Sequence, residues 1–491
     1  MRKGLIPSLR VGLSWHRACF LPVPMRRPRT VLLLVTCWWT TSRVAFGQSA
    51  EPPKALPPAS RSMTLPEAVA YAHAHQPLVR AGLARVAASI EEAKVPTGQW
   101  LPRVGVSGQL LGGTENNSTG SYVGSHAVEI ARIGGEGSNP SSAIPYGSTL
   151  LGAGITQEVF DFGRIAAQRA TLDALVEVQK EAGSAARLDV DFGVEEAYFA
   201  VFAAKGVLRA ADDAFTRAKT HRDLAKAGVD SGLRSPIELT RQEAELVRYD
   251  IGRIRAAGDV AIAESVLGAS IGAPEASVDV VGEAPHPSDM PSLQDAMRGA
   301  AIRDPRVRQA LAQIKVNEEK TRAIGAELRP NAYVTGLASL RGGGAPRSED
   351  PTNPTETAWL PHTPNWDVGL VIDWPIFDGT VVARKNASRA TEQVAREELD
   401  VVREQQVATI EKTFTQFEVA SQALPGLQQA VTAAHANYDQ ADARFRAGLG
   451  NAVELADAQD LRASTEINLA LGQFDAARAR AAFGRAIAEG L

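Results

Sequence analysis

The sequence contains an internal duplication, and this repetition limits the fold more than any other feature. Residues 65–108 align without a gap on residues 293–336, and the shared positions include Pro77 with Pro305. Two further matches follow in the same order along the chain: Phe160-Asp161 with Phe377-Asp378, and Gly232-Leu233 with Gly448-Leu449. Copies of about 200 residues are too long for the unit of a solenoid. The chain is therefore expected to consist of two related halves.

Each half is predicted to contain a helix pair, two strands separated by a long loop, and a long helical hairpin. The first repeat covers residues 65–271 and the second covers residues 293–491. Residues 272–292 are rich in proline and are predicted to link the repeats. Residues 48–64, rich in proline and alanine, are predicted to form an N-terminal tether. The expected fold class is mixed α and β.

The N-terminus has the three-part order of a secretory signal peptide. Residues 26–29 are positively charged, residues 31–41 are mostly apolar, and small residues lead up to Gly47. The apolar run is too short to span a bilayer as a stop-transfer helix. We predict that residues 1–47 are a signal peptide removed by cleavage after Gly47. Met25 begins this signal more naturally than Met1, which favours residues 1–24 as a start-site artefact.

Cysteine is confined to this leader. Cys19 and Cys37 are the only two cysteines, so the rest of the chain has neither a disulfide framework nor a cysteine metal site. A rival interpretation makes residues 34–37 a lipobox with acylation at Cys37. It is disfavoured because Thr36 has the wrong size for the position before the cysteine.

Long segments without helix breakers predict helices that do not fit an ordinary soluble helical bundle. Residues 161–227 carry no proline, and Val194, Val201, Leu208 and Phe215 recur at the heptad spacing of a coiled coil. A helix of about 65 residues would be about 100 Å long. In the second half the apolar spacing runs from Val407 to Leu424, where Pro425-Gly426 is expected to interrupt and bend the helix. Return helices are predicted over residues 236–271 and 452–488.

The strands carry the pattern of a membrane barrel. One strand alternates between two faces, and its apolar, lipid-facing set is Trp366, Val368, Leu370, Ile372 and Trp374. The other face carries Asp367 and Asp373. Weaker apolar stripes lie at residues 104–110, 151–155 and 332–340, although Tyr333 and Leu337 blur the polar face of the last. Taken singly, each stripe is more often half of a soluble sheet, but the export signal and the polar connections at residues 111–147 and 341–365 favour the membrane interpretation. Four strands cannot close a barrel, and open edges are excluded from lipid, so a membrane chain of this kind must oligomerise.

The duplicated order of strand, loop, strand and helical hairpin resembles the TolC-like outer-membrane efflux proteins over about residues 65–491. The resemblance implies a homotrimer in which four strands from each chain form one outer-membrane β-barrel. It further implies that the long helices continue the barrel as a coiled-coil periplasmic tunnel. At the far end of that tunnel a periplasmic adaptor and an inner-membrane pump of the RND or ABC type would dock. The implied location is the outer membrane of a Gram-negative cell, extending into the periplasm.

Two predicted hairpin tips share the same chemistry. Ser235 and Glu238 fit a capping box with Pro236 at the first helical position, and Asn451 with Glu454 is the counterpart. Gly232 and Gly448 suit the helix ends before them. The resemblance implies that the tips contact the adaptor through Gly232, Leu233, Gly448 and Leu449.

An acidic pair is expected to form the gate. Asp457 lies on the same helical face as Glu454, and no helix cap needs it. The family pattern places two acidic residues at this point of the second hairpin, facing the pore at its constriction, and Glu454 and Asp457 match both positions. The first repeat has Arg241 where the second has Asp457, so the two hairpins are not equivalent. The alternative is that Glu238 and Glu454 only cap their helices.

Other functions find little support. The net charge of -4 offers no footprint for nucleic acid. No nucleophile elbow, P-loop, H-E-x-x-H or dinucleotide fingerprint occurs, so we expect no enzyme, no cofactor and no metal. His73 and His75 point to different faces of a helix and are poor metal partners. We interpret the chain as a passive outer-membrane channel of a tripartite efflux or type I secretion system. The alternative is a soluble periplasmic coiled-coil adaptor or scaffold.

Overall fold

The structure is a computed structural model, and it describes residues 61–114, 145–282, 291–343 and 363–489. The predicted signal peptide and the rival lipobox at Cys37 lie outside these ranges, as does most of the predicted tether. The described residues belong to one compact unit that begins at Ala55.

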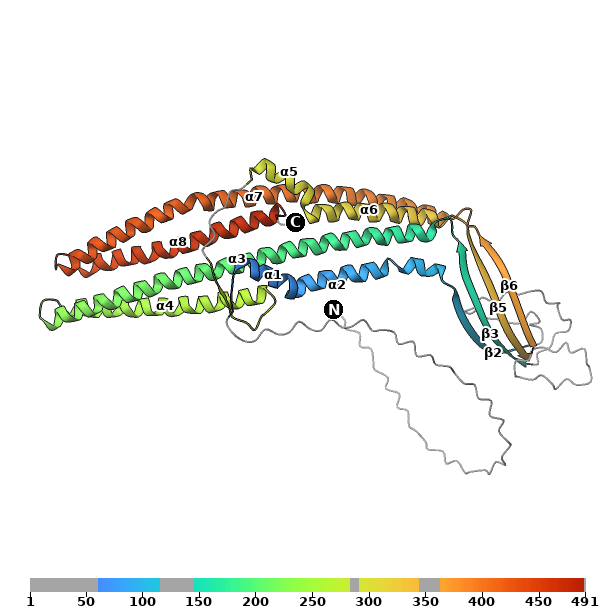
Figure 1. Cartoon of the computed structure of the whole chain (residues 1–491), viewed down its shortest axis with the longest axis horizontal. Coiled ribbons are helices and arrows are strands. Elements are labelled where there is room, and N and C mark those ends of the chain that lie inside the picture. The colour runs from blue at the N-terminus through green and yellow to red at the C-terminus, as the bar shows by residue number, and fades with distance from the viewer. Residues whose placement is uncertain (1–60, 115–144, 283–290, 344–362, 490–491) are drawn as a thin grey trace, which may run out of the picture. The chain divides into compact units, whose positions relative to one another are not determined.

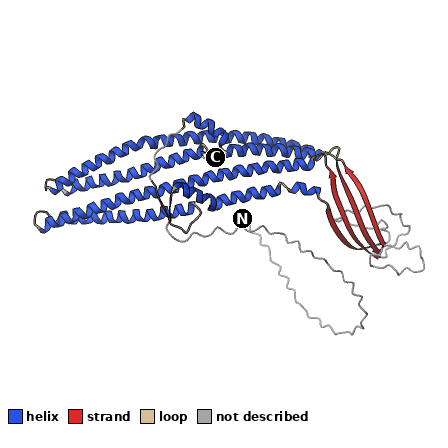
Figure 2. Ribbon diagram, in the orientation of Figure 1, coloured by secondary structure: helices blue, strands red, loops and turns tan. Residues whose placement is uncertain are grey.

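The described part of the chain is mainly helical, and its two halves repeat the same order of elements (Figures 1 and 2). The helices of the first half are α1 (Leu65–His75), α2 (Pro77–Glu92), the 3-10 helix η1 (Val95–Trp100), α3 (Arg164–Asp230) and α4 (Pro236–Ser270). Those of the second half are α5 (Leu293–Arg303), α6 (Pro305–Ala326), α7 (Gly379–Arg446) and α8 (Ala452–Ala486).

The two long helices agree with the sequence pattern in length and in part of the predicted seam, although Leu208 and Phe215 of α3 are only half-buried and Val407 of α7 is exposed. α3 has 67 residues and α7 has 68, so each extends for about 100 Å. Val194 and Val201 of the predicted seam are both fully buried. The return helices α4 and α8 begin at Pro236 and Ala452, as the sequence predicts.

The expected interruption at Pro425 is wrong. Pro425 lies inside α7, and the helix continues through it to Arg446. A proline removes only one backbone hydrogen bond and adds a local clash with the preceding turn. Because α7 packs along most of its partner α8, this local loss does not end the helix.

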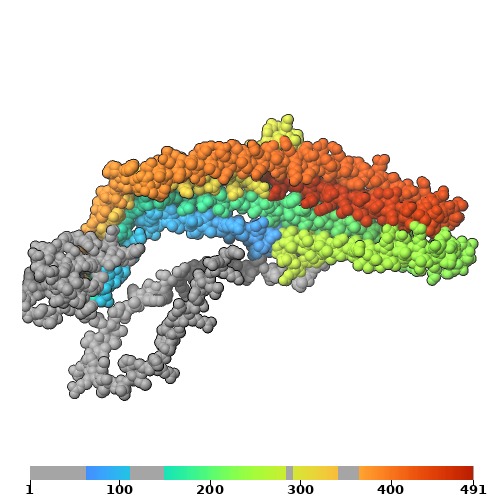
Figure 3. Space-filling view, turned by 180° about the vertical axis from the view of Figure 1, so that it is seen from behind, coloured from blue at the N-terminus to red at the C-terminus, as the bar shows by residue number. Residues whose placement is uncertain are grey.

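The helices lie side by side, both within each hairpin and between the halves (Figures 1 and 3). α3 packs along α4, and α7 packs along α8. Across the halves, α3 contacts both α6 and α8, so the two hairpins form one layer of helices in the chain. α2 and α7 lie on the outer sides of the α3 and α6 pair, next to the sheet.

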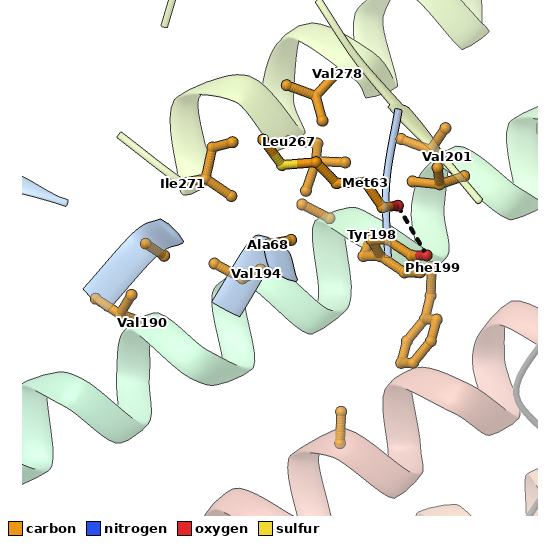
Figure 4. Close-up of a cluster of buried hydrophobic side chains, with 14 of the residues drawn as sticks. Met63, Ala68, Val190, Val194, Tyr198, Phe199, Val201, Leu267, Ile271 and Val278 are labelled. Carbon is orange, nitrogen blue, oxygen red and sulfur yellow. Dashed lines mark hydrogen bonds between the residues drawn. The ribbon is translucent and has the colours of Figure 1, made fainter. Parts of the chain in front are cut away.

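The main apolar cluster lies where α1, α3 and α4 meet (Figure 4). Leu267 and Ile271 from the end of the first hairpin pack there with Val194. The hydroxyl of Tyr198 donates to the carbonyl oxygen of Val281 at 2.8 Å and lies 3.3 Å from that of Met63. The cluster therefore joins the start of the first repeat to its end.

A short parallel sheet in this region has no counterpart in the sequence analysis. Strand β1 (Arg61–Met63) pairs with β4 (Val278–Val280), which places one strand in the predicted tether and the other in the predicted linker. Three residues are too few for an alternating pattern to be recognised. The pairing shows that part of the linker is regular structure.

The larger sheet has four antiparallel strands in the order β2-β3-β5-β6. Their bounds are β2 (Arg103–Thr114), β3 (Pro145–Phe160), β5 (Asn331–Gly343) and β6 (Thr363–Asp373). β2, β3 and β5 extend beyond the apolar stripes predicted at residues 104–110, 151–155 and 332–340, and a register shift interrupts β3 between Glu158 and Phe160. The sheet adjoins the start of α3, whereas the hairpin turn lies at the other end of that helix (Figure 1).

Candidate functional site

The apolar stripes of the four strands are in register and form one continuous face. Val104 pairs with Ile155, which pairs with Gly336, which in turn pairs with Val368. The next row runs from Val106 through Ala153 and Ala338 to Trp366. A single residue of slippage in any pair would move that strand's apolar set to the other face.

This face is open to the surroundings in the single chain. The five residues predicted to face lipid have exposed fractions of 59–80% and are Trp366, Val368, Leu370, Ile372 and Trp374. Trp374 follows directly after the end of β6. Within the described ranges β2 and β6 each pair on one side only, so both edges of the sheet are open.

The opposite face of the sheet, which was predicted to be polar, also carries apolar side chains. Asp367 lies beside Leu337 in the strand register, and Leu337 is only 5% exposed. A methyl group of Leu337 covers Gly152 on the neighbouring strand, where an added Cβ would meet it at 3.6 Å. Tyr333 and Leu337 therefore give this face some apolar surface, as their positions in the sequence suggest.

The matched Phe-Asp dipeptides mark the points at which strands become long helices. Asp161 accepts hydrogen bonds from the backbone N–H groups of Gly163 at 2.9 Å and Ile165 at 2.5 Å. Asp378 accepts from the N–H groups of Thr380 at 2.7 Å and Val381 at 3.4 Å. Each aspartate thus satisfies orphan donors in the first turn of α3 or α7. The alignment of the two repeats identified the dipeptides, but it did not reveal that their aspartates cap the long helices.

The two hairpin tips have the same backbone structure. At the end of α3, the N–H of Leu233 donates to the carbonyl of Gly228, and that of Gly232 donates to the carbonyl of Val229. At the end of α7, Leu449 and Gly448 make the equivalent bonds. Both are Schellman motifs, which need a left-handed residue after the helix.

The glycines supply that conformation, and the leucines protrude. Gly232 and Gly448 both have φ of +73°. Leu233 is 85% exposed and Leu449 is 76% exposed. The structure thus places the four residues expected at the tips on two matching surfaces.

The predicted capping residues behave differently at the two tips. Asn451 caps α8, because its Oδ1 accepts from the N–H groups of Val453 at 3.0 Å and Glu454 at 2.8 Å. The capping box predicted for Ser235 and Glu238 is wrong. Ser235 occupies the N-cap position of α4 but makes no side-chain cap hydrogen bond.

Arg234 explains the missing capping box. Its guanidinium donates to Glu238 at 3.2 Å and to the carbonyl oxygen of Phe445 at 2.7 Å. It also stacks over the ring of Phe445 at 3.8 Å. The carboxylate expected to fold back onto the helix start is instead held by an arginine that joins the first hairpin to the second.

The predicted gate residues lie together on the surface of the second hairpin. Glu454 and Asp457 are both exposed and line one open hollow with Asn437 and Leu461. Glu454 pairs with Arg444 of the same hairpin at 3.2 Å. Arg241, the counterpart of Asp457 in the first repeat, is also exposed. One chain supplies one acidic pair, so a ring of carboxylates would require further copies.

A buried polar cluster between the hairpins was missed by the sequence analysis. His221 is 1% exposed, and its Nε2 lies 2.8 Å from the hydroxyl of Tyr438. Its Nδ1 lies 3.7 Å from Oδ1 of Asp442, and neither of these two atoms has a hydrogen-bond partner. One sequence feature could have revealed the cluster: His221 lies within a stripe of small residues on α3. The stripe is buried and consists of Ala210, Ala214, Ala218 and Ala225.

Charged groups surround this cluster. Burial lowers the pKa of His221, Asp442 acts in the opposite direction, and Arg446 and Arg217 lower it further. Next to it, Glu466 accepts from Arg462 at 3.0 Å. Burial raises the pKa of Glu466, but the neighbouring cations outweigh burial and hold that pKa below its usual range.

A second polar link joins α4 to α8. Tyr249 and Arg248 both donate to the carboxylate of Asp460. Burial, and then the hydrogen bond to Asp460, raise the pKa of the Tyr249 hydroxyl. The two hairpins of one chain are therefore connected at several levels.

The remaining candidates form no metal site. His73 contacts Asp191, whereas the His75 ring stacks on Tyr71 at 3.8 Å, so the two histidines have separate partners. The described residues include no group of three or more His, Cys, Asp or Glu arranged to hold a metal ion. Among the described helices, none has the length and apolarity needed to cross a bilayer.

Comparison with solved structures identifies the fold. The outer-membrane channel OprN matches at 19% identity with a TM-score of 0.63, covering 87% of this chain and 90% of that one. A membrane protein from Pseudomonas aeruginosa matches at 16% identity and 0.66, covering 89% and 96%. The MtrE outer-membrane channel of Neisseria gonorrhoeae, in its open state, matches at 17% identity and 0.63, covering 87% and 89%. The comparison with curated proteins gives no match.

A family model for outer membrane efflux proteins matches residues 69–273 and 297–489, which is most of the chain. The two matched segments correspond to the two repeats, and the first extends two residues into the linker. Proteins of this family are ducts rather than catalysts, so the expectation of a protein without enzymatic activity is confirmed. The recognition of a TolC-like protein from its duplicated strands and hairpins is confirmed as well. The chain belongs to the outer membrane efflux protein family.

Proposed function

We propose that the protein is the outer-membrane channel of a tripartite efflux or type I secretion system. In this role it is a passive exit duct, and an inner-membrane pump of the RND or ABC type drives the substrate through a periplasmic adaptor. The duct lies in the outer membrane and extends into the periplasm. The observation that carries the proposal is the continuous apolar face of a sheet whose two edges are both open.

The open edges require further copies of the chain. Unpaired backbone groups at a sheet edge are not tolerated in lipid, and a closed barrel removes them. Pairing β6 of one chain with β2 of the next would satisfy both edges at once. Three copies would give the barrel that the family resemblance implies, and the apolar rows would then face the membrane around the whole circumference.

The helices also leave apolar surface for neighbouring copies. α4 exposes an apolar stripe of Val247, Ile251, Ile254, Ile262 and Val266. α7 exposes Val419 beside an open groove against α8. Contiguous apolar patches of this kind mark interaction surfaces. We assign both surfaces to the contact between adjacent hairpins in a homotrimer.

The tips and the acidic pair then acquire roles in the duct. Gly232, Leu233, Gly448 and Leu449 are assigned to the adaptor contact, because their leucines protrude at the end farthest from the sheet. Glu454 and Asp457 are assigned to the gate, where three chains would bring together three acidic pairs. Two carboxylates per chain around one axis would attract cations and bind multivalent ones.

The experiment is fractionation followed by reconstitution. The mature protein should sediment with the outer membrane, require detergent for extraction, migrate as a trimer and conduct ions in a planar bilayer. The rival class, a soluble periplasmic adaptor or scaffold, predicts release without detergent and no conductance. Recovery in the soluble periplasmic fraction would reject the channel. The exposed Trp366 and Trp374 count against the soluble alternative.

A further inference from the structure

His221 occupies an unusual position for an ionisable group. It is buried on α3 in the contact with α7, between the rings of Tyr438 and Phe445, whose centroids lie 6.0 Å and 6.2 Å from its own. Of its two ring nitrogens, Nε2 faces the Tyr438 hydroxyl at 2.8 Å. Nδ1 faces Asp442 at 3.7 Å, which is too long for a hydrogen bond.

The neutral ring suits this environment. A neutral imidazole has one donor and one acceptor nitrogen. With the proton on Nδ1, the ring presents a donor to Asp442 and an acceptor to the Tyr438 hydroxyl. The second oxygen of Asp442 is already held by Arg446 at 2.8 Å. The hydrogen bond between Nε2 and the Tyr438 hydroxyl therefore joins the hairpins without a charge on His221.

The protonated ring does not suit it. Both nitrogens would become donors, so the Tyr438 hydroxyl could no longer donate to Nε2. The new positive charge would lie in a buried space bounded by cations on three helices. These are Arg217 on α3, Arg446 on α7, and Arg462 on α8, which lies over the Tyr438 ring at 4.9 Å. Among the described residues, Asp442 is the anion that acts on the ring, and Arg446 pairs with its other oxygen. Glu466 on α8 lies beyond the ring and pairs with Arg217 at 3.5 Å and with Arg462 at 3.0 Å.

We propose that His221 is a proton-sensitive latch, which holds α3 against α7 while its ring is neutral and releases the hairpins when the ring is protonated. The reason is a difference in proton affinity between two states. When the hairpins separate, water reaches the ring and its affinity for a proton returns to that of a free histidine. A proton therefore binds more tightly to the separated state, and acid shifts the population toward it.

The latch lies close to the tip. His221 and Tyr438 lie about three helical turns from the tip glycines Gly232 and Gly448, on the side of the first hairpin that faces the second. Release there would leave Arg234, through the Phe445 carbonyl and ring, as the remaining link at the tips, and would let the tips move apart while the α3 contacts nearer the sheet remain. This regulation rests on the proposed channel function, because it acts at the end of the tunnel where the hairpins meet.

The test measures the separation of the tips as a function of pH. Spin labels are placed at Leu233→Cys and Leu449→Cys, since both sites are exposed and the predicted mature chain has no other cysteine. Labelled chains are assembled with an excess of unlabelled ones, so that each distance comes from one chain. We expect the distance to increase from about pH 8 to about pH 5, with a midpoint below about 6.5. A distance that does not change with pH overturns the latch.

Substitutions identify the proton-binding group. His221→Gln keeps a polar side chain and should abolish the pH response, whereas His435→Gln, at a neighbouring and 40% exposed histidine, should preserve it. Asp442→Asn removes the anion that favours protonation and should move the midpoint to lower pH. Arg446→Gln removes a cation and should move it toward 6.5. A wild-type response in His221→Gln, its loss in His435→Gln, or unshifted midpoints in both charge variants would overturn the proposal.

Conductance measured on the same variants separates this proposal from the channel itself. A protein that conducts in bilayers, but whose tips do not respond to pH through His221, would reject the latch and keep the channel. A protein whose tips respond as expected, but which neither forms trimers nor conducts, would keep the latch and reject the channel.

Discussion

At the scale of single residues, several polar side chains have a structural role because they accept hydrogen bonds from free backbone N–H groups in the first turn of a helix. Asp161 and Asp378 hold the first turns of the two longest helices, which accounts for their appearance in both repeats. Asn451 does the same for α8, but Ser235 does not do so for α4. The two tips are therefore alike in backbone and different in capping.

Replacing Asn451 by Ala should weaken the first turn of α8 by about 1 kcal/mol, because two backbone N–H groups lose their acceptor. Ser235→Ala is the matched control and should change the first turn of α4 by no more than a few tenths of a kcal/mol. Hydrogen exchange of the amides of Val453 and Glu454 measures the effect locally. Equal losses of protection at both tips would contradict the capping difference.

The half-buried carboxyl of Glu195 should make stability depend on pH. Burial, followed by the nearby Asp191, raises the pKa of Glu195 from 4.5 to about 6. A raised pKa in the folded state means that stability is fully present below pH 4.5 and is lost as the pH rises through 6. Glu195→Gln removes this loss and should stabilise the protein at pH 7.5 by about 1–2 kcal/mol. Thermal melting in detergent should show the gain at pH 7.5 and none near pH 4.

The gate assignment depends on Asp457, which has no ion-pair partner in the described part of the chain and caps no helix. Asp457→Ala should raise conductance or weaken block by multivalent cations in planar bilayers, with trimer stability unchanged. Arg241→Ala, at the equivalent position of the first hairpin, is the control and should not weaken cation block. Unaltered conductance and block in Asp457→Ala would leave Asp457 as an ordinary surface acid.

At the scale of elements, the helices of the hairpins could be predicted from the sequence more fully than the pairing of the strands in the sheet. The long helices followed from apolar spacing and, for α3, from the absence of proline, and the starts of the return helices were predicted correctly. The continuation of α7 through Pro425 was not predicted, because it depends on the packing of α7 along α8, which the local sequence around Pro425 does not reveal. The stripes on the strands were visible, but their register across the sheet was not.

The register makes a specific prediction for β6. Leu370→Arg places a charge on the exposed apolar face and should impair barrel assembly by about 2–4 kcal/mol if it lies near the bilayer midplane. Val371→Arg changes the adjacent residue on the less exposed face and should have a milder effect. Both variants are compared by the yield of trimers in the outer membrane. Equal defects would reject the assignment of the two faces.

At the scale of the whole molecule, the duplication accounts for the order of elements but not for the contacts between the halves. The buried cluster of His221, Tyr438 and Asp442 joins residues from different repeats, so no local pattern announces it. Oligomeric closure is likewise absent from the sequence of one chain. It was inferred from a physical requirement, the exclusion of open strand edges from lipid.

The mature protein should begin at Gln48. The motivation is the charged, apolar and small-residue series that ends at Gly47. N-terminal sequencing of the protein extracted from the outer membrane checks this directly. A lipid-blocked N-terminus at Cys37 would instead support acylation.

The pairing of β1 with β4 has a consequence for the order of folding. Each hairpin tip closes a short loop, so each helical pair can form as soon as its own residues are available. Arg61, in contrast, pairs with Val278, and closing such a long loop is slower and entropically harder. Residues 61–63 can therefore pair only after the whole first repeat has been made available, which makes this junction a late step that completes the repeat; for an exported chain, as the predicted signal peptide implies, that step follows passage of the first repeat across the inner membrane.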